Sequence, residues 1–275
     1  MPGGFRPGRR YPGSESNLMP QELYTWDNAM IEGRRRLALL EHSLDPSTFR
    51  RFEAIGVAPG WRCLEIGAGG GTVCEWLGRR VGPTGRVTAM DLDARFLRTL
   101  ELPNLDIREE NVVDAGLPSG TFDLVHTRWT LMHIPERERV LQKLSDCLAA
   151  GGTLFLEEPD AISVRALDHT GFGTLSLRVF EIIQTRGSHP DWARDLPYKM
   201  ASLGLGNVRA EGETPYFHGA SELAEFWRIS WGRVRDALAE SGSDVTQWDR
   251  ELAELDDPAR LFVSPMTLAV IATRP

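Results

Sequence analysis

Residues 63–71 read Cys-Leu-Glu-Ile-Gly-Ala-Gly-Gly-Gly, an apolar run with one acid that passes into glycines. The apolar residues predict a buried strand, and Val73, Trp76 and Leu77 beyond the glycines predict a helix. Glycines between a strand and a helix let the backbone turn tightly and approach a ligand closely. This stretch therefore predicts a ligand site at the first turn of an α/β fold.

The glycine spacing separates two classes of cofactor. In the dinucleotide fingerprint GxGxxG the third glycine would fall at position 72, but Thr72 stands there and Gly71 comes one residue earlier. The pattern is instead ExGxGxG, with the acid Glu65 two residues ahead of Gly67. A nicotinamide-dependent oxidoreductase stays open as the alternative, although this spacing does not suit it.

Strands and helices are expected to alternate after this turn. The helix after Pro135 shows the pattern, because apolar residues recur on one face from Val140 to Leu148 and Gly151 follows where a left-handed cap is wanted. Such alternation implies parallel strands joined by right-handed crossovers, and hence a doubly wound, Rossmann-like α/β sheet of seven strands. The strands are expected near residues 61–66, 86–91, 105–108, 122–127, 152–157, 208–217 and 266–273.

Composition and pattern divide the chain into segments. Residues 1–18 are rich in Gly, Pro, Arg and Ser, and we expect a disordered tail because they offer almost no apolar surface. Apolar residues then recur at helical spacing up to Ile55, before and after Asp45-Pro46, which predicts N-terminal helices. The expected segments are the tail (1–18), an N-terminal helical cap (19–55), the Rossmann-like core (56–160), a helical insertion (161–205), and C-terminal strands (206–275) with a helical insertion at about 219–259.

Composition and charge disfavour several classes of function. The 275 residues are 41% hydrophobic, enough for one elaborated domain, and carry a formal net charge of −8. This charge disfavours nucleic acid as a partner, because phosphate-backbone binding needs a concentrated basic face. The sequence shows no run of about 18 apolar residues and no signal peptide, so we expect a cytoplasmic protein without membrane contact. Cys63, Cys74 and Cys147 lack metal-ligand spacing, and no metal site is expected.

The ExGxGxG turn resembles motif I of the class I S-adenosylmethionine-dependent methyltransferases. Further stretches resemble the same family, in order and at the right spacing, between roughly Gly60 and Asp160. The resemblance implies S-adenosylmethionine as the cofactor, and the overall character is similar to small-molecule methyltransferases of bacterial secondary metabolism. The further stretches are Asp91 at the end of the second strand, Glu110–Asp114, Leu117–His126, Leu131–Pro135 and Leu148–Pro159.

The resemblance also implies which residues hold the cofactor. Glu65 would orient the methionine end, and Asp91 would accept the ribose hydroxyls. Asn111 stands where the family usually has an Asp beside the adenine, which leaves the direction of its hydrogen bond open. The full expected set is Tyr24, Glu65, Gly67, Ala68, Gly69, Gly71, Asp91, Leu92, Asn111, Val112, Thr127 and Arg128.

The implied reaction transfers a methyl group to N, O or C of a small apolar or aromatic metabolite, mostly by alignment of the reactants. His133 is the candidate catalytic base, because imidazole suits proton removal; a helix-start histidine bonded to backbone is the alternative. Aromatic residues of the insertions predict an acceptor pocket, although a plain core stripe would also explain the Trp227/Trp231 pair. The expected acceptor residues are Trp129, Met132, His169, Phe172, Tyr198, Trp227 and Trp231.

Other readings of the same residues stay open. The residues after the fourth strand are Thr127-Arg128-Trp129-Thr130, with no Asn-Pro-Pro-Tyr-like run, which agrees with the charge in disfavouring amino methylation of nucleic acid. A non-catalytic scaffold that keeps only the cofactor site is a second alternative to the enzyme. The expected partner is a small-molecule substrate, and a homodimer is compatible with the sequence.

Overall fold

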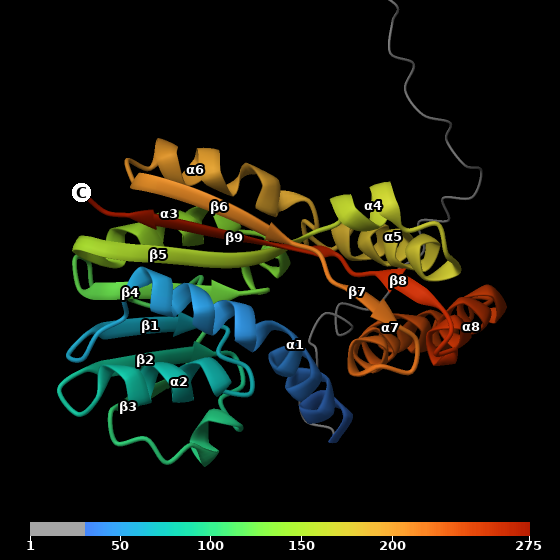
Figure 1. The fold of residues 1–275 in the computed structure, drawn as a ribbon, viewed down its shortest axis with the longest axis horizontal. Helices are drawn as coiled ribbons and strands as arrows, with labels where there is room; N and C mark the ends of the chain where they lie inside the picture. Colours follow the sequence, from blue (N-terminus) through green and yellow to red (C-terminus); the bar gives the residue numbers. More distant parts are fainter. Residues whose placement is uncertain (1–30) are drawn as a thin grey trace, which may run out of the picture.

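The computed structural model describes residues 31–275; the expected tail at 1–18, Tyr24 and the rest of 19–30 lie outside the described residues. The described strands form a seven-stranded sheet in the order β3-β2-β1-β4-β5-β9-β6 (Figure 1), and β7 pairs with β8 in a second sheet. Strands β1 to β5 pair in parallel, whereas β9 runs antiparallel to both neighbours. This confirms the predicted doubly wound sheet. The strands are β1 Arg62–Ile66, β2 Arg86–Asp91, β3 Leu105–Glu109, β4 Phe122–Arg128, β5 Leu148–Asp160, β6 Gly206–Glu213, β7 Tyr216–His218, β8 Leu261–Val263 and β9 Met266–Thr273.

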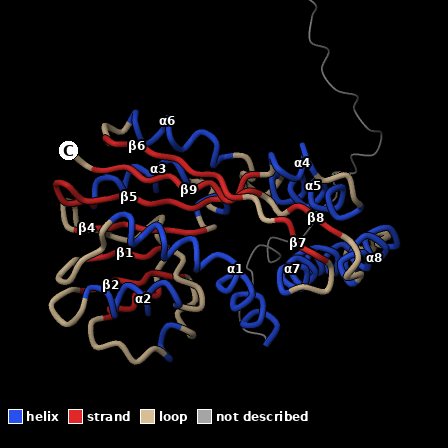
Figure 2. Tube along the Cα trace, viewed as in Figure 1, coloured by secondary structure: helices blue, strands red, loops and turns tan. Residues whose placement is uncertain are grey.

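Helices cover both faces of the large sheet (Figure 2). Successive residues of a strand point to opposite faces, so Cys63 packs with α1 and α2 whereas Leu64 packs with α3 and α6. Both side chains are fully buried. The four helices are α1 Ile31–Ile55, α2 Thr72–Val81, α3 Arg137–Cys147 and α6 Leu196–Ser202.

A separate helical layer lies beyond the carboxyl ends of the parallel strands, on the right of Figure 1. It has its own apolar core, centred on Phe172, Trp227 and Phe262. The layer consists of α4 Ile162–Leu167, α5 Gly171–Gln184, α7 Glu222–Glu240, α8 Thr246–Ala253, β7 and β8. Short 3-10 turns at Leu97–Thr99, Leu131–His133, Trp192–Asp195 and Glu254–Asp256 complete the described elements. The two inserted stretches therefore meet each other over one end of the sheet.

Three local expectations differ from the structure. The two N-terminal runs form one helix, α1, with Pro46 inside it, since the helix tolerates the single hydrogen bond that Pro46 cannot donate. The strand expected over 208–217 is broken before Pro215, and its second part pairs with β8 instead. Gly151 is left-handed, with φ of 76°, but it lies within β5 rather than capping α3, which ends at Cys147.

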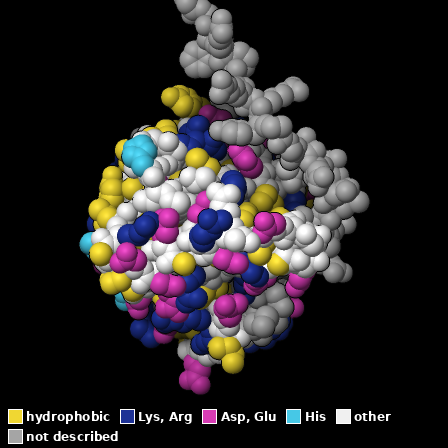
Figure 3. All heavy atoms as spheres, turned by 90° about the vertical axis from the view of Figure 1, so that its right-hand side faces the viewer, with side chains coloured by type: hydrophobic (Ala, Val, Ile, Leu, Met, Phe, Trp, Pro, Cys, Tyr) yellow, Lys and Arg dark blue, Asp and Glu magenta, His cyan; other side chains and the backbone are white. Residues whose placement is uncertain are grey.

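The described surface carries both signs of charge. Acidic and basic side chains are interspersed on the face that the helical layer presents in Figure 3. Within residues 31–275, none of the helices combines the length and the apolar character that a membrane span requires. In the same range, His, Cys, Asp and Glu side chains form no group arranged to hold a metal ion.

Candidate active site

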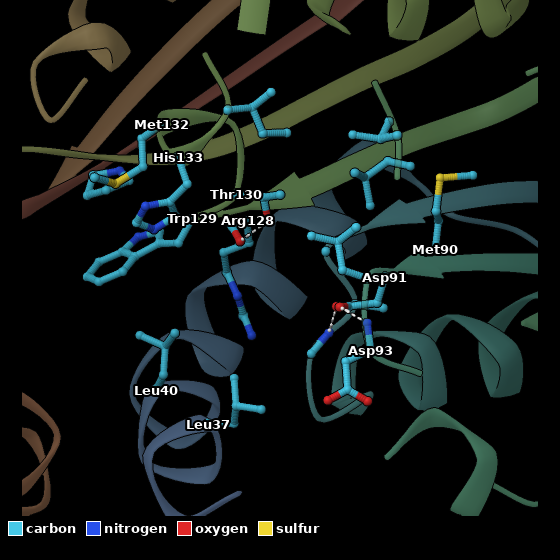
Figure 4. Close-up of a pocket in the computed structure, with 18 of the residues that line it drawn as sticks. Leu37, Leu40, Met90, Asp91, Asp93, Arg128, Trp129, Thr130, Met132 and His133 are labelled. Carbon is cyan, nitrogen blue, oxygen red and sulfur yellow. Dashed lines mark hydrogen bonds between the residues drawn. The ribbon is translucent and has the colours of Figure 1, made fainter. Parts of the chain in front are cut away.

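A cavity of about 690 Å³ opens at the carboxyl ends of β1, β2 and β4. The strand order reverses here, because β1 lies between β2 and β4, and open α/β sheets bind ligands at such a switch point. Its volume lies in the range of about 300 to 1,000 Å³ that small-molecule sites occupy. Figure 4 shows Asp91 on one side, Trp129 and His133 on the other, and Leu37 and Leu40 of α1 below.

The turn from β1 to α2 requires glycine at two positions. Gly67 has φ of 68°, and a Cβ there would overlap the hydroxyl of Thr130. Gly71 has φ of 95° and directly precedes α2. Both conformations strain any residue with a side chain, so the close approach of the turn to its surroundings depends on glycine. Three residues of the turn line the cavity: Gly67, Ala68 and Gly69.

Asp91 ends β2, and its carboxylate lies at the cavity wall (Figure 4). Its Oδ2 accepts a hydrogen bond from the backbone N–H of Gly69 at 2.9 Å, and its Oδ1 accepts one from Asp93 at 3.0 Å. Burial raises the pKa of Asp91, and these backbone N–H groups offset part of the rise. A carboxylate has about four lone-pair sites, so Asp91 can still accept hydrogen bonds from hydroxyl groups of a ligand.

Below the glycine turn, His126 lies between two buried carboxylates. Its Nδ1 is 2.6 Å from Glu65 Oε2, and its Nε2 is 3.2 Å from Glu157 Oε2. Burial lowers the pKa of His126, but the two carboxylates outweigh burial and raise it to about 9. Burial raises the pKa of Glu65, whereas contact with His126 brings the pKa of Glu157 below its ordinary value despite burial. We therefore assign a charged imidazolium held by an ionised Glu157.

The same cluster fastens α1 to the sheet. Arg51 Nη1 donates to Glu157 Oε1 at 2.8 Å, and Thr48 Oγ1 donates to Glu157 Oε2 at 2.6 Å. Arg128, at the end of β4, donates to Asp45 at 2.8 Å and to Thr48 at 2.9 Å. Charge-assisted hydrogen bonds thus hold α1 in the turns that follow its cavity-lining residues.

Beyond β3, Asn111 lines the cavity with Val112. The side-chain oxygen of Asn111 accepts a hydrogen bond from the backbone N–H of Val113 at 3.0 Å. That bond uses one of the two lone pairs of the oxygen, and the amide NH₂ stays available to donate to a ligand. Leu92 also lines the cavity and is exposed at its mouth.

The opposite wall of the cavity is aromatic. Trp227 of α7 lies 5.9 Å from Trp129 and 4.8 Å from Trp231, measured between ring centroids. Trp129 has φ of 52°, an unusual conformation for a residue with a side chain. The buried carboxylate of Glu158 accepts backbone hydrogen bonds from Thr130, Leu131 and Met132, which fixes this turn. The wall is therefore formed by three neighbouring indole rings, and the backbone that follows Trp129 is held by Glu158.

Comparison with known proteins agrees with this geometry. The family model for a methyltransferase domain matches residues 64–156, which run from β1 into β5. The chain carries a class I methyltransferase domain. Domains of this class depend on S-adenosylmethionine, and the site fits that cofactor: the cavity combines a glycine turn with a hydroxyl-accepting carboxylate at the end of β2.

Individual relatives resemble parts of the chain. A ubiquinone biosynthesis O-methyltransferase of Xanthomonas campestris is 34% identical over 122 residues, which cover 42% of this chain and 50% of that protein. The chain thus spans about half the length of this curated relative. A putative methyltransferase from Bacillus halodurans has the same fold, with a TM-score of 0.56, 16% identity, and coverage of 83% of this chain and 99% of that one. The [4+2]-cyclase SpnF also shares the fold, with a TM-score of 0.51, 16% identity, and coverage of 82% and 80%.

Most residues predicted from the sequence gather around this cavity of the methyltransferase domain. Asp91 and the glycine turn lie on one side, and the aromatic residues lie on the other. His133 forms part of the wall next to Trp129 (Figure 4). The predicted residues that line the cavity are Glu65, Gly67, Ala68, Gly69, Asp91, Leu92, Asn111, Val112, Arg128, Trp129, Met132, His133, Trp227 and Trp231.

Other predicted residues lie elsewhere. Thr127 is fully buried inside β4 and Gly71 caps α2, so both support the cavity without lining it. Phe172 is buried behind the aromatic wall, 6.0 Å from Trp227 between ring centroids. His169 is exposed, and Tyr198 on α6 is 78% exposed on a helix that covers the sheet. The expectation that Phe172, His169 and Tyr198 line the acceptor pocket is corrected by these positions.

Sequence reasoning missed several residues of the cavity. Helix α1 contributes Arg36, Leu37, Leu40 and Glu41, whose spacing places them along one side of the helix. The spacing shows in the sequence that these residues share one side of a helix. The sequence does not show that this side faces the cavity. Burial raises the pKa of Glu41, which lies beside Gly70. The helical layer adds further residues: Phe180, Ile183, Phe226 and Ser230.

Proposed function

We propose that the protein transfers a methyl group from S-adenosylmethionine to N, O or C of a small apolar or aromatic metabolite. One observation carries this proposal: a single cavity joins the glycine turn and Asp91 to the aromatic wall of Trp129, Trp227 and Trp231. The cavity thus has a polar half next to an apolar half. This arrangement suits a polar methyl donor beside an apolar methyl acceptor. The likeness of the core to a quinone O-methyltransferase supports the same class of acceptor.

The chain's own residues would act mainly by binding and alignment. Asp91 would accept the ribose hydroxyls, the Asn111 amide and the Val112 backbone would bind the adenine, and Glu65 would orient the amino-acid end. The bound cofactor supplies the methyl group on its sulfonium. Holding the acceptor in line with that methyl can lower the barrier by about 7 to 11 kcal/mol in favourable cases.

His133 is the candidate base of this proposal. Burial lowers the pKa of His133 to about 4, and the charges of Arg36 and Arg137 act in the same direction. The imidazole is therefore neutral at pH 7 but weakly basic, because a general base works best when its pKa lies near the working pH. Its Nδ1 also lies 3.4 Å from the Ser188 hydroxyl. We assign it at most a minor share of the rate.

Two experiments test the proposal in sequence. Thermal unfolding is measured with S-adenosylhomocysteine and with NAD; stabilisation by NAD alone would replace the proposal with the oxidoreductase alternative. The protein is then incubated with isotopically labelled S-adenosylmethionine and a metabolite extract, and mass spectrometry detects labelled products. Binding without any labelled product would favour the non-catalytic scaffold, or a different reaction such as that of the cyclase with the same fold.

The proposal also covers the location of the enzyme, its type of metabolism, the segments on its acceptor side and its oligomeric state. We propose a cytoplasmic enzyme of secondary metabolism with a small-molecule partner, in which the segments 161–205 and 219–259 form the acceptor side. The support is that the cavity residues Phe180 and Trp227 come from these two segments. A homodimer is part of the same proposal, and sedimentation of the purified protein would test it.

A further inference from the structure

Two buried polar atoms of α7 lack a hydrogen-bond partner among the described residues: Trp227 Nε1 and Ser230 Oγ. Both residues are 2% exposed, and both line the cavity. They are three positions apart, so they lie on the same face of the helix. A buried polar group without a partner costs free energy, which a ligand that bonds it recovers.

Three other tryptophans differ in this respect. The indole N–H of Trp231 donates to Ser176 Oγ at 3.0 Å, and that of Trp129 donates to Thr267 Oγ1 at 3.1 Å. Trp192, on the far side of β5, donates to Glu138 at 2.7 Å. Tryptophan N–H groups usually find a partner when buried, and the fold supplies one in these three cases. The exception at Trp227 therefore points to a partner that residues 31–275 do not provide.

The surroundings limit what that partner can be. Phe226 packs against Trp227 with ring centroids 4.8 Å apart, and Trp231 lies equally close on the next turn of α7. Phe180 and Ile183 complete an apolar lining on this side of the cavity. A ligand here gains mainly by burying apolar surface, and it needs one polar atom that accepts from an indole N–H.

We propose that Trp227 and Ser230 form an oxygen-binding subsite for the acceptor, which is a planar apolar molecule carrying a hydroxyl or carbonyl oxygen. Trp227 Nε1–H donates to that oxygen, and Ser230 Oγ either donates a hydrogen bond to it or accepts one from its hydroxyl group. This inference rests on the proposed function, because it places the acceptor on the aromatic side of the cavity. It goes further in naming the chemical group by which the acceptor is recognised.

The test compares two probes of nearly equal shape, 1-naphthol and 1-methylnaphthalene, by equilibrium dialysis with saturating S-adenosylhomocysteine. The wild-type protein should bind 1-naphthol about tenfold more tightly, a difference of about 1.4 kcal/mol. The double variant Trp227→Phe/Ser230→Ala should bind both probes equally and should keep the wild-type affinity for 1-methylnaphthalene. A double variant that keeps the full preference, or a wild type that shows none or binds neither probe, would overturn the subsite.

Two controls separate this subsite from folding and from the proposed function. Trp192→Phe removes an indole N–H that Glu138 already bonds at a position outside the cavity, so the ratio of the two affinities should not change. The double variant removes two unpartnered polar atoms and also part of a buried indole ring, so it should fold with an unfolding temperature somewhat below that of the wild type. If S-adenosylhomocysteine does not bind to the wild type, the proposed function fails, whereas the preference for 1-naphthol can still be measured without it.

Discussion

His126 Nδ1 lies 2.6 Å from Glu65 Oε2, so a fully buried histidine contacts the acid that stands two residues before the glycine turn. Glu65 lines the cavity, whereas His126 lies one layer below it. Through Glu157, the same imidazole is linked to Thr48 and Arg51 of α1. The orientation of this cavity-lining acid thus depends on a buried imidazolium that does not line the cavity itself.

Replacing His126 by Gln should weaken both folding and cofactor binding. Removing one partner of a buried ion pair leaves an uncompensated charge and costs about 3 to 5 kcal/mol of unfolding free energy. Urea denaturation would measure this loss, and calorimetric titration with S-adenosylhomocysteine would measure the loss of affinity. His42→Gln is the matched control, because His42 is exposed on α1 and should change neither quantity. Wild-type stability in His126→Gln would contradict the charged cluster.

The stability of the protein should also fall at alkaline pH because of His126. Its ordinary pKa is 6.5, and the two carboxylates raise it to about 9 against the effect of burial. The folded protein therefore keeps a proton that the unfolded chain releases between these values. This contribution is complete below about pH 6.5 and is lost as the pH rises through about 9. Denaturation at pH 6, 7.5 and 9 should show the decline in wild type and a flatter profile in His126→Gln.

Asp91→Asn should reduce cofactor affinity and should also lower the unfolding free energy by about 1 kcal/mol, because the amide can accept only one of the two backbone hydrogen bonds that the carboxylate accepts. Hydrogen bonds to a charged group contribute about 1.5 to 3 kcal/mol, which corresponds to a loss of about 10- to 100-fold for the ribose contacts. Titration with S-adenosylhomocysteine measures this change. Asp106→Asn on β3 provides the control, because Asp106 is half-exposed and lies outside the cavity. Equal affinity in wild type and Asp91→Asn would remove Asp91 from the site.

Gly67→Ala should abolish cofactor binding and lower the unfolding free energy by about 1 to 3 kcal/mol. The added methyl group would stand in the left-handed region at φ of 68° and overlap the Thr130 hydroxyl. Gly116→Ala is the matched control, since a Cβ at Gly116 has open space around it. If Gly67→Ala bound S-adenosylhomocysteine normally, the close approach of this turn would have no role in binding.

The sequence predicted the core of the fold because its signals there are local. Arg86–Asp91 matches the strand expected over 86–91, and Arg62–Ile66 matches 61–66 to within one residue. Buried parallel strands and glycine turns leave such signals in a few consecutive residues. The break before Pro215 was missed, although proline is rarely found inside a sheet and the residues ahead of it, Glu211–Thr214, carry no apolar side chain.

The acceptor side could be predicted only in part, because it depends on tertiary packing. Trp227 and Phe172 are both buried aromatic residues of the helical layer, yet only Trp227 lines the cavity. Tyr198 is an aromatic residue of the kind expected in an acceptor pocket. Its helix, α6, packs on the sheet and leaves the Tyr198 side chain exposed. The packing of α5 against α7 determines which face of each helix lines the cavity. No short sequence motif predicts that packing.

Replacing His133 measures how much of the proposed catalysis depends on proton transfer. Loss of a general base typically costs about 100- to 10,000-fold in rate. With its pKa lowered to about 4 by burial, and further by Arg36 and Arg137, His133 is a weak base throughout the range from pH 6 to 9. His133→Ala should therefore reduce the turnover of the acceptor found by mass spectrometry by less than about tenfold.

Rates of S-adenosylhomocysteine release between pH 5 and 9 would measure this effect for wild type and for His133→Ala. His218→Ala serves as the control, because His218 is exposed on β7 and lies outside the cavity. Both variants should keep the shape of the wild-type pH profile. A loss of 100-fold or more in His133→Ala, together with disappearance of an acidic limb of the profile, would instead establish His133 as the base and alignment as only part of the mechanism.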